Sequence, residues 1–387
     1  MGNSSSTESI NTSSSDCCNG MCSPIGLKNF GNTCYMNAGL QFIAAMGIFT
    51  EENFGDIRIN ESSSEEVCKS LISVLIRLSK PSNSNMGNNS SLGNNNDDYL
   101  APYKLYKQLK QLNPYLFNQK QQDAHEFIMY VLEIIHDGTL IACNSPKISN
   151  EELERLSKKN TRPGITFWND YLMRNNSILN NSICGQFRSR ITCQNCGSNS
   201  DTYDPFLDIT LALPEKPDDN NNITIGSCFR KFFEQQQLFQ DNDKPSYNCS
   251  NCRSVVNATR CINISQFPRI MLVTLKRFNN NGGKCNAIVK FKTAGIVLKS
   301  LTEIGHFKLV AVLQHNGSTL FQGHYISYVL KSETEKWYKI DDEVVTLVDD
   351  ILDEEIQAYC LLYVLESKNT LSSNFDGKYK QNSGRYL

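Results

Sequence analysis

The sequence predicts an α+β protein, with helices in its first half and an antiparallel sheet in its second half. Apolar residues recur at helical spacing over residues 65–80, as in an amphipathic helix. From about residue 185 onward, short apolar runs alternate with turn residues, which is typical of strands. We find no internal repeat, and 387 residues with 40% hydrophobic content suffice for a large core.

The first half predicts four helical elements. Residues 29–45 read as a turn followed by a helix, with Asn32 or Thr33 as the N-cap. The second helix covers residues 65–80, and two more are expected at 101–112 and 121–136.

The second half predicts strands that end at turn residues. The clearest apolar runs lie at 270–277, 307–314, 325–330, 337–340 and 360–365.

Several segments are too polar to bury surface and order themselves. Residues 1–22 are rich in Ser, Asn and Thr, and residues 82–98 and 216–223 are expected to be Asn-rich insertions. Residues 366–387 are predicted to form a loose C-terminal tail.

Composition excludes several classes of function. The net charge of −2 favours neither a nucleic-acid partner nor a polybasic membrane patch. No apolar run approaches the roughly 18 residues of a spanning helix. The N-terminal residues lack the basic region followed by an apolar one that is typical of a signal peptide, so none is expected. The 15 cysteines are odd in number, and four of them form two Cys-x-x-Cys pairs. We therefore expect a reducing compartment, the cytoplasm, and thiols kept for metal binding and chemistry.

A cysteine, a histidine and a carboxylate stand out as parts of a thiol nucleophile. Cys34 is expected at the first turn of its helix, where free N–H groups and the helix dipole favour a thiolate. Asn29, on the preceding turn, is a candidate donor to an oxyanion. The alternative is that Cys34 is a small buried residue at a helix start.

The predicted hairpin supplies the base. A pairing centred near residue 333 places His324 almost opposite Asp341 and Asp342. A carboxylate beside an imidazole fixes its tautomer and stabilises its charged form. His315, nine residues earlier, is a second candidate for the base, and the aspartates can also be read as a solvated turn.

These segments together resemble the ubiquitin-specific proteases, a family of papain-like thiol proteases. Residues 26–41 look like the cysteine box of that family, and Gln121-Gln122-Asp123-Ala124-His125-Glu126-Phe127 looks like its second conserved segment. Residues 267–278, 315–328, 337–345 and 358–363 resemble the later boxes in the same order. The match covers residues 24–365, and its one departure near Cys34 is Ala38-Gly39 inside the helix.

The resemblance implies a fold, an activity and a set of residue roles. The fold is a hand, with a helical thumb at 24–184, fingers at 185–265 and a β palm at 266–365. The implied activity is hydrolysis of the isopeptide bond after the last glycine of ubiquitin, by a protein that we expect to be a monomer. The implied nucleophile is Cys34, the base His324, the orienting acid Asp341 and the oxyanion donor Asn29, with Asp342 sharing the role of Asp341.

Four further residues are implied to hold the basic ubiquitin tail: Gln122, Asp123, Glu126 and Tyr325. The two acids suit a basic peptide, although a helix N-terminus also favours acids without any ligand. A ubiquitin-like modifier as substrate, and a non-catalytic ubiquitin-binding scaffold, stay open as alternatives.

Two cysteine pairs predict a structural zinc site. The ligands are Cys193, Cys196, Cys249 and Cys252, and four thiolates in tetrahedral array close such a site to water. The long span between the pairs is read as the finger strands, and the alternative is two unrelated pairs of free thiols.

The first residues match a lipidation pattern. Met1-Gly2-Asn3-Ser4-Ser5-Ser6 fits myristoylation of Gly2, and Cys17, Cys18 and Cys22 are candidates for palmitoylation. One myristoyl chain binds membranes only marginally, so a second acyl chain is needed for stable attachment at a cytoplasmic membrane face. The alternative is an unmodified polar tail.

Overall fold

The computed structural model describes residues 23–80, 99–143, 145, 148–157, 163–215, 223–240, 244–245, 247–279, 283–320, 322–353 and 355–370. The predicted insertion at 82–98 and the lipidation candidates Gly2, Cys17, Cys18 and Cys22 lie outside these residues. Within the described part, no helix has the length and apolar character needed to cross a membrane.

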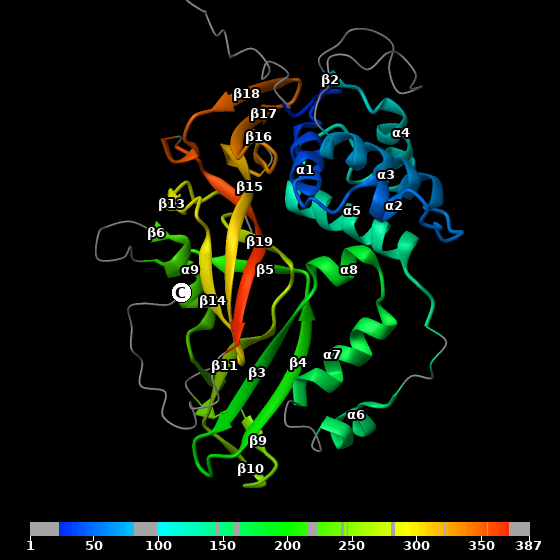
Figure 1. Ribbon diagram of the computed structural model, residues 1–387. Helices are drawn as coiled ribbons and strands as arrows, with labels where there is room; N and C mark the ends of the chain where they lie inside the picture. The colour runs from blue at the N-terminus through cyan, green and yellow to red at the C-terminus, as the bar shows by residue number, and fades with distance from the viewer. Residues whose placement is uncertain are drawn as a thin grey trace, which may run out of the picture.

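Helices gather on one side of the molecule, at the right of Figure 1. The four predicted helices are confirmed, with ends that differ by at most a few residues. A short unpredicted helix, α2, lies between the first two of them, and three further helices follow the last. The helices of this side are α1 (Cys34–Ala44), α2 (Glu51–Phe54), α3 (Glu65–Ser79), α4 (Tyr103–Leu112), α5 (Ala124–Thr139), α6 (Asn150–Ser157), α7 (Pro163–Arg174) and α8 (Ile178–Ile183).

Helix α1 packs closely on α5 because Gly39 has no side chain. A Cβ atom at Gly39 would lie 2.6 Å from Cδ1 of Phe127. Phe127 is fully buried and is flanked by the rings of Tyr35 and Phe117. The glycine that departs from the family pattern therefore fixes the approach of the helix that carries Cys34.

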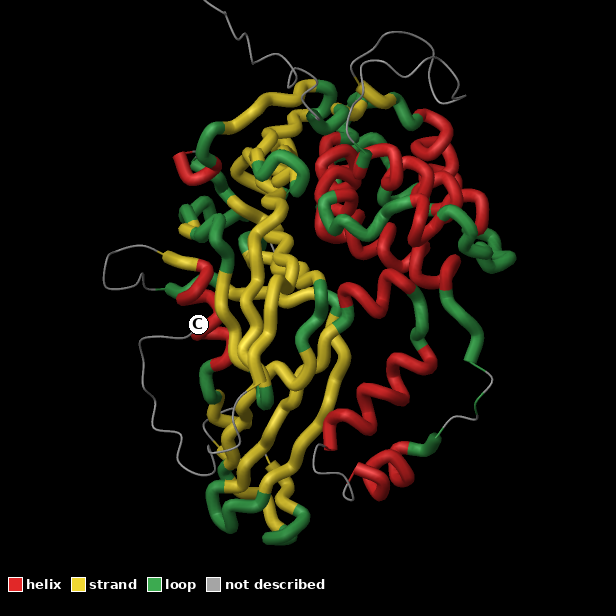
Figure 2. Tube along the Cα trace, viewed as in Figure 1, coloured by secondary structure: helices red, strands yellow, loops and turns green. Residues whose placement is uncertain are grey.

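An antiparallel sheet forms the palm, beside the helices in Figures 1 and 2. Its strand order is β18-β17-β16-β15-β19-β12-β5, and β14 also pairs with β15. The strands are β5 (Asp208–Ala212), β12 (Ile270–Lys276), β14 (Ile296–Lys299), β15 (Glu303–Thr319), β16 (Gln322–Lys331), β17 (Lys336–Asp341), β18 (Val344–Val348) and β19 (Ala358–Thr370). Only β5 runs parallel to its neighbour, β12.

The central strands of the palm sheet are buried on both faces, whereas β18 at its edge is largely exposed. One face contributes Leu272, Leu313 and Val329 to a core shared with α1, α3 and α5. The other face packs against α9 (Ile225–Phe233), with Val273, Val312 and Phe229 in a second core. The sheet is therefore the rigid layer that carries the histidine hairpin.

The fingers form a second sheet, with strand order β4-β3-β11-β7-β8. A short hairpin lies at its lower tip in Figure 1. The finger strands are β3 (Gly185–Cys193), β4 (Asn199–Phe206), β7 (Gln236–Gln240), β8 (Lys244–Pro245), β11 (Ala258–Gln266) and the tip pair β9 (Tyr247–Cys249) and β10 (Ser254–Val256).

Two predicted boundaries are wrong. The finger range 185–265 includes β5 and α9, which belong to the palm because β5 pairs with β12 and α9 covers the palm core. The predicted tail 366–387 begins with strand, because β19 runs to Thr370 and pairs with β15.

The remaining elements are short. They are β1 (Gly26–Leu27) paired with β2 (Tyr99–Leu100), β6 (Ile223–Thr224) paired with β13 (Val289–Lys290), and a 3-10 turn at Ile351–Asp353.

Candidate active site

The hairpin of β16 and β17 brings His324 to Asp341. The two strands pair antiparallel with Ser327 opposite Ile340, which places their outer ends together as the sequence predicts. His324 Nε2 lies 2.6 Å from Asp341 Oδ1 and 3.9 Å from Asp342 Oδ2. Asp341 is therefore the carboxylate that contacts the imidazole.

Cys34 reaches the same imidazole from α1, which packs against β16. It is the first residue of α1, is 1% exposed, and lies 290 residues before His324 in the chain. A hydrogen bond with Cys34, opposed by partial burial and reinforced by Asp341, raises the pKa of His324 to about 9. At neutral pH the imidazole is therefore held in its charged form between sulfur and carboxylate.

A turn held by Asn29 presents Cys34 at the helix start. Asn29 Oδ1 accepts hydrogen bonds from the backbone N–H of Gly31 at 2.9 Å and of Thr33 at 3.2 Å. Gly31 and Asn32 both have positive φ, at 91° and 53°, a conformation that glycine and asparagine tolerate best. The side-chain carbonyl of Asn29 thus fixes the turn itself.

The amide group of Asn29 contacts the second aspartate. Asn29 Nδ2 donates to Asp342 Oδ2 at 2.7 Å, and Asn37 Nδ2 donates to Asp342 Oδ1 at 2.7 Å. Burial raises the pKa of Asp342, although both amides oppose that shift. Asp342 therefore links the β17 end to the turn and to α1, a role that the sequence did not predict for it or for Asn37.

Gln121 also contacts the sulfur and was not assigned a role from the sequence. Its Oε1 lies 3.6 Å from Cys34 Sγ, and its Nε2 donates to Asn32 Oδ1 at 3.3 Å. The only sequence signal was its place in the segment that precedes α5.

The residues predicted to hold a peptide tail flank this centre. Asp123 caps α5, and the single hydroxyl of Tyr359 lies 2.8 Å from both of its carboxylate oxygens. Gln122 Nε2 donates to Asn118 Oδ1 at 2.8 Å, and Glu126 is exposed on α5. Tyr325 follows His324 but is only 1% exposed, so its ring is part of the core.

His315, the second candidate for the base, is buried away from the sulfur. It is fully enclosed, and neither ring nitrogen has a hydrogen-bond partner among the described residues. Burial, with the cation of Lys284 nearby, lowers the pKa of His315 to about 4. A Cβ atom at Gly323 would lie 2.3 Å from His315 Nε2, so the glycine lets the strand pass over the ring.

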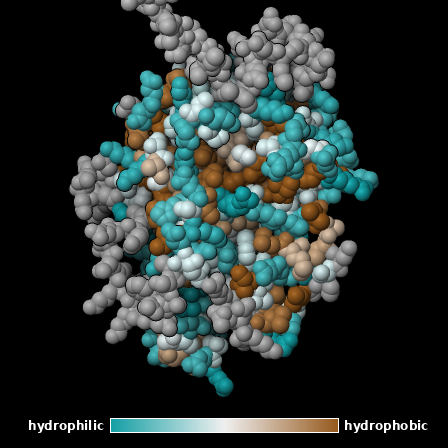
Figure 3. Space-filling model, in the orientation of Figure 1, coloured by the Kyte–Doolittle hydropathy of each residue, from teal (hydrophilic) through white to brown (hydrophobic). Residues whose placement is uncertain are grey.

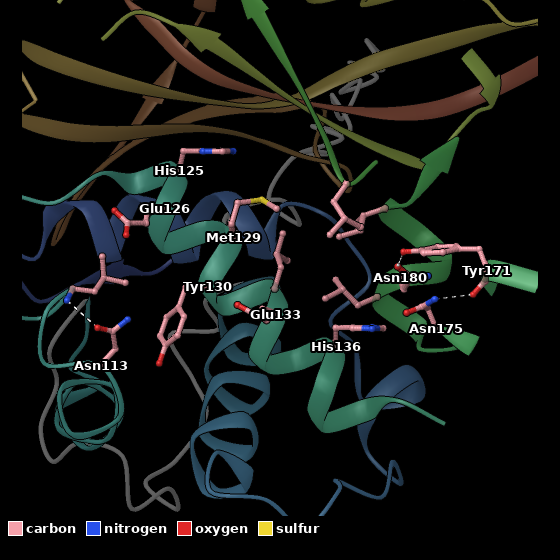
Figure 4. Close-up of a pocket in the computed structure, with 15 residues that line it drawn as sticks. Asn113, His125, Glu126, Met129, Tyr130, Glu133, His136, Tyr171, Asn175 and Asn180 are labelled. Atoms are coloured by element: carbon pink, nitrogen blue, oxygen red, sulfur yellow. Dashed lines mark hydrogen bonds between the residues drawn. The ribbon is translucent and has the colours of Figure 1, made fainter. Parts of the chain in front are cut away.

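A cavity of about 700 Å³ lies between α5 and the helices α7 and α8. Figure 4 shows Glu126, Tyr130, Glu133 and His136 along one side of α5. In the surface view, hydrophobic residues gather near α5, while hydrophilic residues predominate over the helices at the upper right (Figure 3). Cys34 and His324 do not line this cavity.

Four cysteines meet at the finger tip and can hold a metal ion. Cys193 is the last residue of β3 and Cys196 lies in the turn after it, while Cys249 and Cys252 belong to the β9–β10 hairpin. All four sulfurs lie within 4.8 Å of one another. The Sγ atoms of Cys193 and Cys252 are 3.8 Å apart, and those of Cys196 and Cys249 are 3.7 Å apart. Zinc bonds of about 2.3 Å in a tetrahedron require sulfurs about 3.8 Å apart, so the donor set fits zinc.

A sulfur at a helix start, an imidazole and an orienting carboxylate define the class of thiol hydrolases with a cysteine–histidine–acid site. The particular family follows from comparison: the chain matches the ubiquitin carboxyl-terminal hydrolase family over residues 25–363 and belongs to it.

Relatives cover most of this chain. Ubiquitin carboxyl-terminal hydrolase 2 of Bos taurus is 27% identical over 358 residues, which span 88% of this chain and 55% of the bovine protein. The chain thus spans about half the length of that relative. The Gallus gallus protein of the same name is 27% identical over 361 residues, which span 89% of this chain and 94% of its own.

Solved structures share the fold. A chain of the SAGA Ubp8 DUB module bound to monoubiquitin superimposes with a TM-score of 0.66 at 22% identity, over 89% of this chain and 70% of that one. The same module bound to ubiquitin aldehyde gives a TM-score of 0.64 at 22% identity. Identity at this level shows the hand-shaped α+β fold alone.

Proposed function

We propose that the protein is a cysteine deubiquitinase that hydrolyses the isopeptide bond after the C-terminal glycine of ubiquitin. The observation that carries the proposal is the convergence of Cys34, His324 and Asp341 in a chain of the ubiquitin carboxyl-terminal hydrolase family. The ubiquitin bound to the solved relatives supports this choice of substrate.

The reaction follows from the protonation states of the pair. The Cys34 thiolate attacks the glycine carbonyl and forms a tetrahedral oxyanion. The imidazolium of His324 gives its proton to the leaving lysine amine as the C–N bond breaks, which leaves a thioester. His324 then takes a proton from water as the resulting hydroxide attacks the thioester. Collapse of this second tetrahedral intermediate breaks the C–S bond and releases the Cys34 thiolate beside the recharged imidazolium, and the ubiquitin carboxylic acid loses its proton to solvent. Asp341 keeps the ring oriented throughout.

Asn29 is proposed as a donor to the oxyanion, together with backbone N–H groups at the start of α1. Its place on the turn before Cys34 supports this role. Asn29 Nδ2 carries two N–H groups: one donates to Asp342, and the second is the proposed donor to the oxyanion.

Asp123 and Glu126 are proposed to attract the basic tail of ubiquitin, with Gln122 beside its path. Tyr325 is left out of this role because it is buried in the core. The acidic side chains stand at the start of α5, on the same segment as Gln121, which contacts the sulfur. A charged hydrogen bond from an arginine to such a carboxylate is among the stronger polar contacts.

A structural zinc ion at the finger tip is part of the proposal. Its ligands would be Cys193, Cys196, Cys249 and Cys252, whose sulfur separations fit a tetrahedral site. The ion would hold the two knuckles together and takes no part in the reaction at Cys34.

The test of the proposed function is the hydrolysis of a fluorogenic ubiquitin conjugate by the wild-type chain and by Cys34→Ala. We expect turnover from the wild type alone. A matched conjugate of a ubiquitin-like modifier shows whether that modifier is the preferred substrate instead of ubiquitin. If a folded wild-type chain binds ubiquitin without turnover, the protein is a non-catalytic scaffold.

Monomeric state, cytoplasmic location and membrane attachment stay predictions from the sequence. The lipidation candidates lie outside the described residues. Labelling with an alkyne myristate tests the anchor, because a protein without label, or an unchanged membrane fraction in Gly2→Ala, excludes it.

A further inference from the structure

Lys284 sits beneath the strand end that pairs with the catalytic histidine. Its Nζ donates to the backbone carbonyl of His315 at 2.5 Å and to that of Gly317 at 3.1 Å. The third donor goes to Gln357 Oε1 at 2.7 Å, just before β19. An ammonium has three N–H donors, and here each of them has an acceptor.

The two carbonyls bracket the residue that faces His324. In the pairing of β15 with β16, Asn316 lies directly opposite His324, and the regular register breaks immediately after Asn316. Gly317 has a φ of 156°, where the strand leaves the regular ladder. A strand end at such an irregularity lacks part of its ladder of hydrogen bonds, so a side chain must hold it.

The backbone around Lys284 supports the same strand end. Gly283 forms an isolated bridge with Thr319, and the backbone N–H of Lys284 donates to the carbonyl of Ser318 at 3.2 Å. Burial and the neighbouring Arg277 lower the pKa of Lys284 to about 8, and none of its bonded partners is a carboxylate. The ammonium group therefore binds three neutral oxygens around one strand end. Partial burial of a cation without a carboxylate partner is energetically unfavourable, which suggests that the position of this strand end is important.

We propose that Lys284 is a positioning residue for the reaction, which holds the end of β15 so that His324 stays in contact with Cys34 and Asp341. It acts through the backbone at His315 and Gly317 and touches none of the reacting atoms. The inference rests on the proposed thiol hydrolase function.

The test measures the reactivity of Cys34 itself, without ubiquitin. Iodoacetamide at pH 7 alkylates the thiolate, and mass spectrometry of the peptide that contains Cys34 gives its rate apart from the other cysteines. The variants are Lys284→Met, which keeps the length and removes the donors, and Lys284→Arg, which keeps the charge. Lys290→Met is the matched control, because Lys290 is exposed on β13.

We expect Lys284→Met to slow alkylation of Cys34 about tenfold, as loss of a charged hydrogen-bond group at a precise site does. Lys284→Arg should recover most of the rate, and Lys290→Met should match the wild type. On a ubiquitin conjugate, kcat should fall in Lys284→Met with little change in KM. A folded Lys284→Met with wild-type alkylation and kcat would overturn the inference.

Two further outcomes are decisive. If Lys284→Met does not fold, Gln357→Leu is the deciding variant, because it removes one acceptor and leaves the lysine. We expect Cys34 of this variant to react about two- to threefold more slowly. An unchanged rate would reject the positioning role of Lys284. If the wild-type chain does not hydrolyse the ubiquitin conjugate, the proposed function fails and the inference falls with it.

Discussion

At the scale of single residues, the two adjacent aspartates have different surroundings. Asp341 is 2.6 Å from the His324 ring, whereas Asp342 holds the amides of Asn29 and Asn37. The positive φ of Asp342, at 50°, turns the chain so that the two carboxylates face different partners. Asp341 is thus placed to orient the base, and Asp342 is placed to join the hairpin to the turn before Cys34.

The charge on His324 predicts the alkaline limb of activity. The thiolate–imidazolium pair needs the proton on His324, so kcat/KM should fall as the pH rises through about 9, the raised pKa of this ring. Asp341 contributes to that rise, so Asp341→Asn should move the limb to lower pH and reduce the maximum rate. The pH dependence of kcat/KM on a ubiquitin conjugate measures both.

Asp349→Asn serves as the control, because Asp349 is an exposed carboxylate beyond β18. An alkaline limb that stays at the same pH in Asp341→Asn would show that Asp341 does not support the charge on His324.

Asn29 predicts a loss confined to kcat. Asn29→Ala should lower kcat about a hundredfold or more if its amide serves the oxyanion, since removal of one such donor costs 10²–10³ in comparable sites. Because Asn29 Oδ1 also holds the turn, Thr33→Val is the comparison. This variant removes the Thr33 hydroxyl that donates to Asn29 Oδ1 at 3.1 Å but keeps the side-chain amide of Asn29. Equal losses in both variants would assign Asn29 to the turn alone.

At the scale of elements, the position of α1 depends on its contact with α5. The sequence predicts both helices from apolar spacing and capping, and it marks Gly39 as costly in a helix. It does not show that Phe127 occupies the space at Gly39, because that contact joins segments 88 residues apart. The low helix propensity of Gly39 is therefore offset by the close packing of α1 on α5 that the glycine allows.

Gly39→Ala should lower the free energy of unfolding by about 1–3 kcal/mol through overpacking, even though alanine favours a helix by about 1 kcal/mol. Denaturant unfolding measures the change. In a Phe127→Leu background the same substitution should cost less, because the smaller side chain gives space. Equal costs in both backgrounds would contradict the proposed contact.

At the scale of the whole molecule, the sequence predicts the candidate catalytic residues better than it predicts the residues that hold them in place. The boxes around Cys34 and His324, and the hairpin register, place the candidate triad before any coordinates. The sequence does not reveal Gln121 beside the sulfur, Asn37 on Asp342, or Lys284 under β15, because each contact joins residues distant in the chain. Likewise, β5 leaves the finger range to pair with β12, a parallel pairing that local pattern cannot indicate.

We expect the fold of the fingers to depend on the metal ion, whereas the catalytic centre should not depend on it. The purified chain should contain one zinc per molecule, and Cys249→Ser should lose it and lower the thermal midpoint. The alkylation rate of Cys34 should stay close to that of the wild type as long as the palm remains folded. Elemental analysis with thermal unfolding checks this, and a stable, metal-free wild type would argue for four free thiols at the tip.

The central claim is that Cys34 is a nucleophile activated by His324 and aimed at the end of ubiquitin. Ubiquitin with a C-terminal vinyl sulfone tests it most directly, with peptide mapping of the adduct. We expect one covalent ubiquitin per chain, attached to Cys34 and lost in Cys34→Ala, with much slower attachment in His324→Ala. A folded wild-type chain that forms no adduct, or forms it at another cysteine, would contradict the account.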